Sequence, residues 1–215
     1  MTRAELVAEI RKKLGYNTGL TESYITDAID NAQDMMEDMP ESPWFMTQEL
    51  QSLATIADTE TVALPTDFKR EIEEAELWYY DSTATEPWTE LAKGSIPELR
   101  HYYSNVTQTS YKPKAYAVSA SNIYIFPEPD AVYVLKWTYM GALTKMAADG
   151  DTNGWSLYAP YVLIGKAGML LADNNRDKIG RGVFEKIYAE AYQRLWRMNE
   201  AREHAGQTYQ RGGAD

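Results

Sequence analysis

One stretch of the sequence has the residue types and the spacing of a cation-binding loop. Residues 149–154 read DGDTNG, which matches the first six positions of a calcium loop, D-x-D-x-N-G. The twelfth position of such a loop supplies a bidentate glutamate, but Pro160 stands there. Asp and Asn also form turns and cap helices. The pattern therefore favours a turn before a helix, and we expect neither a metal ion nor a cofactor.

A second group of residues has the types needed for glycoside hydrolysis. That chemistry requires two carboxyl groups about 5–10 Å apart, one with a raised pKa, beside a sugar cleft. The sequence supplies only a cluster of glutamates, and acidic clusters are usually solvated. The candidates are Glu71, Glu73, Glu74 and Glu76.

Other catalytic patterns do not occur in the sequence. His101 and His204 are far apart and lack zinc-site spacing. The chain has no cysteine, which excludes disulfides, thiolate metal sites and a cysteine nucleophile. It also has no P-loop, nucleophile elbow or dinucleotide fingerprint. The sequence therefore predicts a protein that is not an enzyme.

The composition is that of a globular and acidic protein. Its 215 residues are 44% hydrophobic and 25% charged, with a formal net charge of −11. Residues 14–68 contain eleven acidic side chains and no basic one, so this segment carries the whole net charge. An acidic face repels phosphate, which disfavours a role in reading DNA sequence. A solvated face that maintains solubility is the simplest interpretation.

Hydropathy predicts a soluble protein that is made and kept inside a cell. The amino-terminal segment is amphipathic and mixed in charge, unlike a secretory signal. The longest apolar run, 161–172, is interrupted by Lys166 and is too short to cross a bilayer. We therefore expect no membrane partner.

Helix signals lie near both ends of the chain. Thr2 and Glu5 have capping-box spacing, and a second helix begins at Thr21 and stops before Pro40. After the DGDTNG stretch, a buried helix covers 161–172, with Pro160 in its first turn. A long last helix runs over 177–203, and a flexible, extended tail follows it.

Between the helices the sequence favours β-strands. Residues 48–65 suggest two short strands that turn through 57–59. Three later runs, 114–118, 122–126 and 132–140, predict an antiparallel meander. Segments 66–83 and 86–105 mix strand-like aromatics with short helical pieces.

The predicted fold class is α+β. The amino- and carboxy-terminal helices form a helical bundle, a β-rich antiparallel insert projects from it, and an extended C-terminal tail follows. The predicted boundaries are 1–43 and 153–205 for the bundle, 44–152 for the insert and 206–215 for a docking tail.

Two elements have more apolar surface than a single neighbour would cover. In the strand 132–139 both faces are largely apolar, so cover comes from helices of the same chain, from a neighbouring subunit, or from a stacked sugar. The last helix has a second aromatic stripe outside its main apolar face. The candidate subunit-interface residues are Tyr133, Trp137, Tyr139, Tyr192 and Trp196.

The order of features over residues 62–205 is similar to that of the head–tail adaptor proteins of tailed bacteriophages, also called connector, head-completion or tail accessory proteins. Three features carry the resemblance: L-P-x-D-F at 64–68, P-x-P-D at 127–130, and a helix start N-x-W at 153–155. Family members usually have Asn directly before Trp, whereas Gly154 intervenes here.

The resemblance implies a structural virion protein. Such proteins form a homo-oligomeric ring, typically of twelve copies, between the portal protein and a tail or nozzle protein. The ring retains the packaged genome and continues the channel for its ejection, so double-stranded DNA passes without sequence-specific binding. The implied location is the virion neck, after assembly in the host cytoplasm.

The resemblance also suggests a role for the end of the chain, because the C-terminal segment of these proteins commonly reaches the portal. The implied portal contacts are Gln207, Thr208, Tyr209, Gln210 and Arg211.

Two other functions remain open. A tail protein that binds or hydrolyses cell-wall glycan would use the aromatic insert and the glutamate cluster. A minor tail or receptor-binding protein would bind the host surface instead of the portal.

Overall fold

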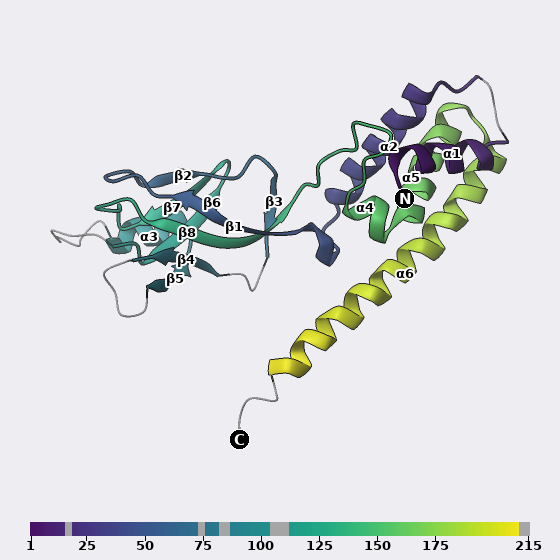
Figure 1. Ribbon diagram of the computed structural model, residues 1–215. Coiled ribbons are helices and arrows are strands. Elements are labelled where there is room, and N and C mark those ends of the chain that lie inside the picture. The colour runs from purple at the N-terminus through teal and green to yellow at the C-terminus, as the bar shows by residue number, and fades with distance from the viewer. Residues whose placement is uncertain (16–18, 73–75, 82–86, 104–111, 211–215) are drawn as a thin grey trace. The chain divides into compact units, whose positions relative to one another are not determined.

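The chain has a mixed α+β fold that divides into two compact units (Figure 1). We call residues 1–46 with 142–215 the helical unit, and residues 47–141 the sheet unit. For 51–52 and 203–210 the backbone alone is described. The computed structural model as a whole describes residues 1–15, 19–72, 76–81, 87–103 and 112–210.

The sheet unit is built on a curled, mixed sheet. Within the described residues its strands follow the order β1-β8-β4-β5-β6-β7-β2, and β3 also pairs with β8. The elements are β1 (Thr47–Ala54), β2 (Thr61–Ala63), β3 (Phe68–Glu71), β4 (Leu77–Tyr80), β5 (Trp88–Lys93), α3 (Ile96–Tyr103), β6 (Ala115–Ser119), β7 (Asn122–Phe126) and β8 (Val134–Gly141).

The strands form as expected, but two of their pairings differ from the predicted antiparallel meander. β6 and β7 form the expected hairpin, with Ala120 at a φ of 53° in its turn. β8 does not pair with β7, because Thr55 and Tyr133 exchange hydrogen bonds that bring β8 beside β1. β5 and β6 are parallel, so the sheet is not purely antiparallel. The long connection through α3 permits this arrangement, which a tight turn would not.

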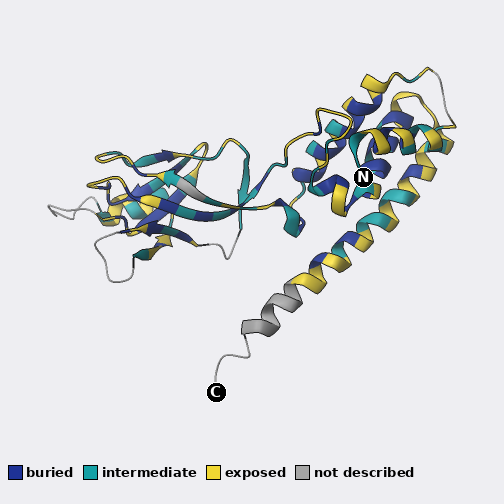
Figure 2. Cartoon of the chain, in the orientation of Figure 1, coloured by how far each residue is buried: buried dark blue, intermediate teal, exposed yellow. Residues whose placement is uncertain are grey.

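The core of the sheet unit lies on the inner face of these strands (Figure 2). Leu135 and Trp137 of β8 are 0% and 1% exposed, and Phe68 stacks on Trp137 with a ring-centroid separation of 5.3 Å. Tyr79 and Tyr133 meet edge to face at 5.4 Å. Aromatic contacts between strands therefore hold much of this core together.

The predicted helix starts in the helical unit are confirmed. The Thr2 hydroxyl accepts a hydrogen bond from Glu5 N, and the Glu5 carboxylate accepts one from Thr2 N. Thr21 accepts from Tyr24 N. The elements are α1 (Arg3–Lys13), α2 (Glu22–Glu37), a 3₁₀ turn (Trp44–Met46), α4 (Gly154–Tyr158), α5 (Pro160–Asn174) and α6 (Lys178–Gln210).

Helix α5 is the buried centre of the helical unit. It packs against α6 and α2, and it also touches α1 and α4. Gly168 and Gly165 face Phe184 and Tyr188 of α6, where a Cβ atom would overlap the neighbouring atoms. The two glycines thus permit the close approach of α5 and α6.

Helix α6 is longer than predicted, and this corrects the expected extended tail. The backbone stays helical through residues 206–210, while residues 211–215 lie outside the described residues. Gly206 does not end the helix, because a single glycine costs only about 1 kcal/mol in a helix interior and the residues around it are mostly tolerated in helices.

A buried polar cluster joins α2 to the segment that leads into α4. Glu37 Oε1 accepts hydrogen bonds from Gln33 Nε2 at 2.9 Å, Leu143 N at 3.2 Å and Trp155 Nε1 at 3.2 Å. Asn153 Nδ2 donates to Gln33 Oε1 at 2.9 Å. Because buried polar groups need partners, these bonds define where the chain re-enters the helical unit.

Candidate interaction surfaces

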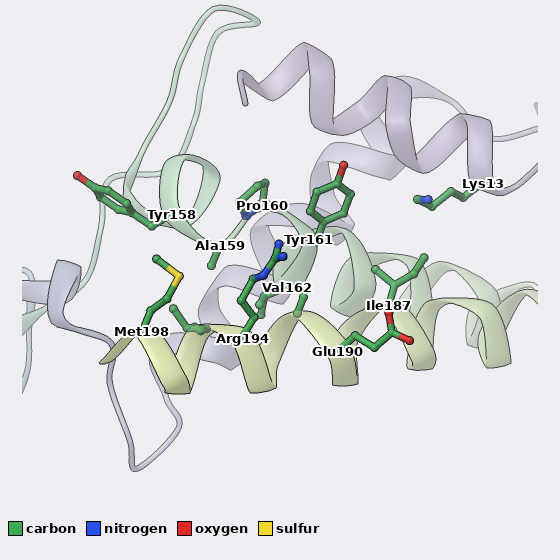
Figure 3. Close-up of a pocket in the computed structure, with 12 residues that line it drawn as sticks. Lys13, Tyr158, Ala159, Pro160, Tyr161, Val162, Ile187, Glu190, Arg194 and Met198 are labelled. Carbon is green, nitrogen blue, oxygen red and sulfur yellow. The ribbon is translucent and has the colours of Figure 1, made fainter. Parts of the chain in front are cut away.

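A groove of about 570 Å³ runs between α6 and the start of α5 (Figure 3). We call it the α6 groove. Arg194 points from α6 toward the first turn of α5, and Lys13 reaches in from the end of α1. The residues that define this groove are Lys13, Tyr158, Tyr161, Glu190, Arg194 and Met198.

The local sequence explains why aromatic side chains surround the start of α5. Ala159 adopts φ −135° and ψ 44°, which interrupts the helix between α4 and α5. Pro160 then begins α5, in the first turn, where its missing N–H costs nothing. Tyr158 and Tyr161 remain 48% and 47% exposed on either side of this break. The result is an apolar rim with basic side chains beside it.

A second groove, of about 550 Å³, lies between α2 and the end of α5. We call it the α2 groove. Two of its apolar side chains, Tyr24 and Met35, are 39% and 47% exposed. Its polar side is acidic and includes Asp27, Asp34 and Asp38. This groove combines an exposed apolar floor with a cluster of like charges.

The charges on the two helices differ in sign. Helix α2 has five acidic residues and no basic one, whereas α6 has six basic and four acidic residues. Burial raises the pKa of Asp30 on α2, although Lys145 and Arg3 oppose this shift. Lys145 also pairs with Asp34 at 2.7 Å. Arg11 lies 3.9 Å from Glu22, so cations of other elements offset part of the acidic charge of α2.

The sheet unit has an apolar row on its outer face. Val134 pairs with Tyr80, and Tyr80 pairs with Trp88 in the neighbouring strand. Tyr80 and Trp88 meet edge to face at 5.2 Å. Val132, just before β8, is 68% exposed, and Ile56, just after β1, is 61% exposed. The face of the predicted ribbon that contains Val132 and Val134 is thus the one without cover in the described fold.

Three of the predicted interface residues lie in the core instead. Tyr133, Trp137 and Tyr139 are 9%, 1% and 3% exposed, so their side chains do not form a surface. The two tyrosine hydroxyls form hydrogen bonds within the sheet unit: Tyr133 donates to Asp130 at 2.7 Å and Tyr139 donates to Asp67 at 2.8 Å. Alternate residues of β8 point inward because the curled sheet closes over that face.

The other two predicted interface residues lie on α6. Tyr188, Tyr192 and Trp196 form a ladder, with Tyr192 stacked on Tyr188 at 5.4 Å and edge to face with Trp196 at 5.6 Å. Tyr192 and Trp196 are partly buried. Their role in a subunit contact stays a prediction.

The predicted portal contacts fall at the end of α6. Residues 207–210 belong to its last turns, and their side chains lie outside the described part of the chain. Arg211 lies wholly outside it. These residues also remain predictions.

The calcium-like stretch serves as a turn and a helix cap, as expected. Asp151 Oδ2 accepts from the backbone N–H groups of Ala147 and Ala148 at 2.9 and 2.7 Å. Asn153 Oδ1 accepts from Ser156 N at 3.0 Å and caps α4. Within the described residues, no group of three or more His, Asp or Glu side chains could hold a metal ion.

The glutamates proposed for glycan chemistry do not form a described site. Glu71 pairs with Lys93 at 2.8 Å, and Glu76 is exposed. Glu73 and Glu74 lie outside the described residues. His101 is exposed on α3, and the side chain of His204 is not described.

Sequence reasoning did not identify the two grooves. The α2 groove combines α2 with the end of α5, and the α6 groove combines Lys13 with residues of α5 and α6, so no local spacing reveals either one. One available signal was the pair Tyr158 and Tyr161 around Pro160, where two large rings flank a helix start.

Comparison with known proteins gives a family match over nearly the whole chain. The family model described as SU10 adaptor protein matches residues 1–212. A search of curated proteins finds no match. No helix in the described parts of the chain combines the length and apolar character that a membrane span needs.

Proposed function

Since this chain belongs to the SU10 adaptor protein family, a family of phage head–tail adaptors, we propose that it joins the portal of the capsid to the tail as a closed ring. The observation that carries this proposal is the match over residues 1–212. The family implies a virion protein that oligomerises and contacts portal and tail proteins. Its role is structural and not enzymatic.

The proposed ring has twelve copies, the usual number for proteins that this chain resembles. A ring requires two different contact patches on each subunit. The exposed apolar surfaces on the helical unit and on the outer face of the sheet unit support such contacts, because apolar patches of this kind mark interaction sites.

In this proposal the ring continues the DNA channel and holds the packaged genome until ejection. The formal net charge of −11 supports passage without tight binding. Tight DNA contacts require Lys and Arg side chains that release counterions from the phosphates, and the chain has an excess of acids. The duplex would therefore slide without being read.

The end of α6, with residues 211–215, is proposed as the portal-docking segment. Its helical backbone through Gln210 supports a rigid extension in place of an extended strap. This keeps the predicted contacts at 207–211, but it changes the expected form of residues 207–210 from an extended chain to a helix.

The proposal is tested by mixing the purified protein with the portal encoded by the same genome, followed by sedimentation and imaging of the product. The expected result is a symmetric ring added beneath the portal, whose subunits can be counted. If the folded protein does not bind the portal at any concentration tried, the proposal is wrong. A pull-down with host envelope or peptidoglycan would then test the tail-tip and glycan functions.

A further inference from the structure

We infer that the α6 groove of one copy receives helix α2 of a neighbouring copy, so that the two grooves form the contact between subunits. This inference rests on the proposed ring and assigns its contact to particular faces. Within one helical unit α5 packs against α6 and against α2, and each of these two helices borders a groove. One chain therefore presents both halves of a contact.

Charge complementarity supports this pairing. The α6 groove has Lys13 and Arg194 on its rim, with Glu190 as the acidic member. The charged residues of the α2 groove are all acidic: Asp27, Asp34 and Asp38. The difference in sign extends beyond the grooves, because α2 has five acids and no base, whereas α6 has six bases and four acids. Opposite potentials across a contact favour the correct pairing and exclude others.

Apolar surface is available on both sides of the proposed contact. The α6 groove exposes Tyr158, Tyr161 and Met198, and the last of these is 38% exposed. The α2 groove exposes Tyr24 and Met35. Aromatic and Met side chains are enriched at the centres of protein interfaces, with a polar rim around them. Both grooves have this composition.

The signs of charge also favour a head-to-tail contact over a twofold dimer. In a twofold contact centred on the α2 groove alone, the acidic α2 face would meet a second acidic α2 face. Like charges placed together across an interface are unfavourable. A contact between different patches avoids this repulsion and leaves one free groove at each end, which lets the assembly continue until it closes.

Charge reversal on each face provides the first test. The acidic-face variant carries Asp27→Lys and Asp38→Lys, and the basic-face variant carries Lys13→Glu and Arg194→Glu. We expect each variant to raise the concentration for half-maximal ring assembly on the portal at least about tenfold. Mixing the two variants, or joining all four substitutions in one chain, should restore assembly because the charges are opposite again.

Matched control variants separate the effect of the position of a charge reversal from the effect of the change in net charge. Glu76→Lys with Glu128→Lys changes the charge as the acidic-face variant does, and Lys114→Glu with Lys178→Glu matches the basic-face variant. All four control positions are exposed and lie outside both grooves. We expect both control variants to assemble like the wild type. Urea unfolding of every variant checks that the fold is retained.

Cross-linking provides a second test that does not need the portal. The chain has no cysteine, so introduced cysteines are the only thiols. Met35→Cys places one in the α2 groove and Met198→Cys places one in the α6 groove. At high concentration a short bis-maleimide should join the two variants when they are mixed, at a yield several-fold above that of either variant alone.

The outcomes distinguish this inference from the proposed function. If wild-type protein forms a ring on the portal and both charge-reversal variants do so at the same concentration, the face assignment is wrong and the adaptor function stands. If the variants form the ring but lose tail attachment, the grooves bind a tail protein and the inference is also wrong. If wild-type protein forms no ring and the mixed cysteine variants do not cross-link, both proposals are wrong.

Discussion

The indole N–H of Trp155 donates a hydrogen bond to Glu37 Oε1 across 3.2 Å, between two buried side chains that lie 118 residues apart in the chain. Trp155 is 0% exposed and Glu37 is 2% exposed. The bond joins the last turn of α2 to α4. In the sequence, the whole sheet unit lies between these two helices. A single carboxylate thus links the two halves of the helical unit.

Replacement of Glu37 by Leu should lower the free energy of unfolding by about 1–3 kcal/mol, because buried donors lose their acceptor. Glu37→Gln retains an acceptor oxygen and should cost less. Glu41→Leu is the control, since Glu41 is exposed, and it should lie within about 0.5 kcal/mol of the wild type. Urea unfolding measures all three. Equal stability of Glu37→Leu and wild type would contradict the role of this cluster.

Gly168→Ala should destabilise the helical unit by about 1–3 kcal/mol, because the new methyl group would overlap the ring of Phe184 where α5 meets α6. Gly182→Ala is the matched control on α6. A Cβ there meets no atom within 4 Å. The change should therefore stabilise the fold by about 0.5–1 kcal/mol, because alanine is more favourable than glycine in a helix interior. Thermal unfolding with opposite shifts for the two variants is the expected result.

Stability should fall steeply in alkaline solution. Burial raises the pKa of Tyr116 to about 12, and nearby glutamates add to the shift. The folded state therefore holds this proton more tightly than the unfolded chain, whose tyrosine pKa is about 10. The stabilising contribution is complete below pH 10 and is lost as the pH rises toward 12. Burial also raises the pKa of Tyr133 and of Tyr139. The hydrogen bond from Tyr133 to Asp130 and the one from Tyr139 to Asp67 add to these shifts.

Urea unfolding at several pH values between 8 and 12 measures this effect. Tyr116→Phe removes one titrating group and should make the alkaline decline shallower. Tyr102→Phe is the control, because Tyr102 is 69% exposed, and its curve should follow the wild type. A Tyr116→Phe curve with the wild-type slope would show that this phenol does not contribute.

Removal of residues 206–215 should weaken portal binding at least about tenfold. The fold should stay intact, because α6 buries its apolar face before residue 206: Phe184 and Leu195 are 0% and 2% exposed. Removal of 211–215 alone separates the helical end from the final residues. Portal binding by sedimentation and unfolding by circular dichroism are measured on the same samples. Full binding by the longer truncation would assign portal contact to another surface.

Local sequence signals determined the helix starts. Thr2 with Glu5, Thr21, and Asn153 before α4 all cap helices as expected, since a cap depends on residues within one turn of each other. Strand runs at 114–126 formed the expected hairpin for the same reason. The calcium-like loop lacks its twelfth ligand. This absence correctly indicated that Asp151 forms a turn and that Asn153 caps a helix.

The tertiary structure decided which faces are covered. Both faces of the strand 132–139 are apolar in sequence, and only the curl of the sheet shows that Tyr133, Trp137 and Tyr139 point inward while Val132 and Val134 point outward. Strand partners were also hidden: β8 pairs with β1, β3 and β4 instead of β7. Pairing depends on contacts between distant segments, and adjacency in sequence does not encode them.

The two grooves also show which properties follow from the sequence alone and which require the tertiary structure. The acidic run at 14–68 and the basic residues of α6 are visible in the sequence, but the positions of the two grooves at the start and the end of α5 are not. Residue types and short-range spacing establish helices, strands and charge, because those properties arise from neighbouring residues. A surface arises from segments that meet only after folding, so the location of the candidate contact required the tertiary structure.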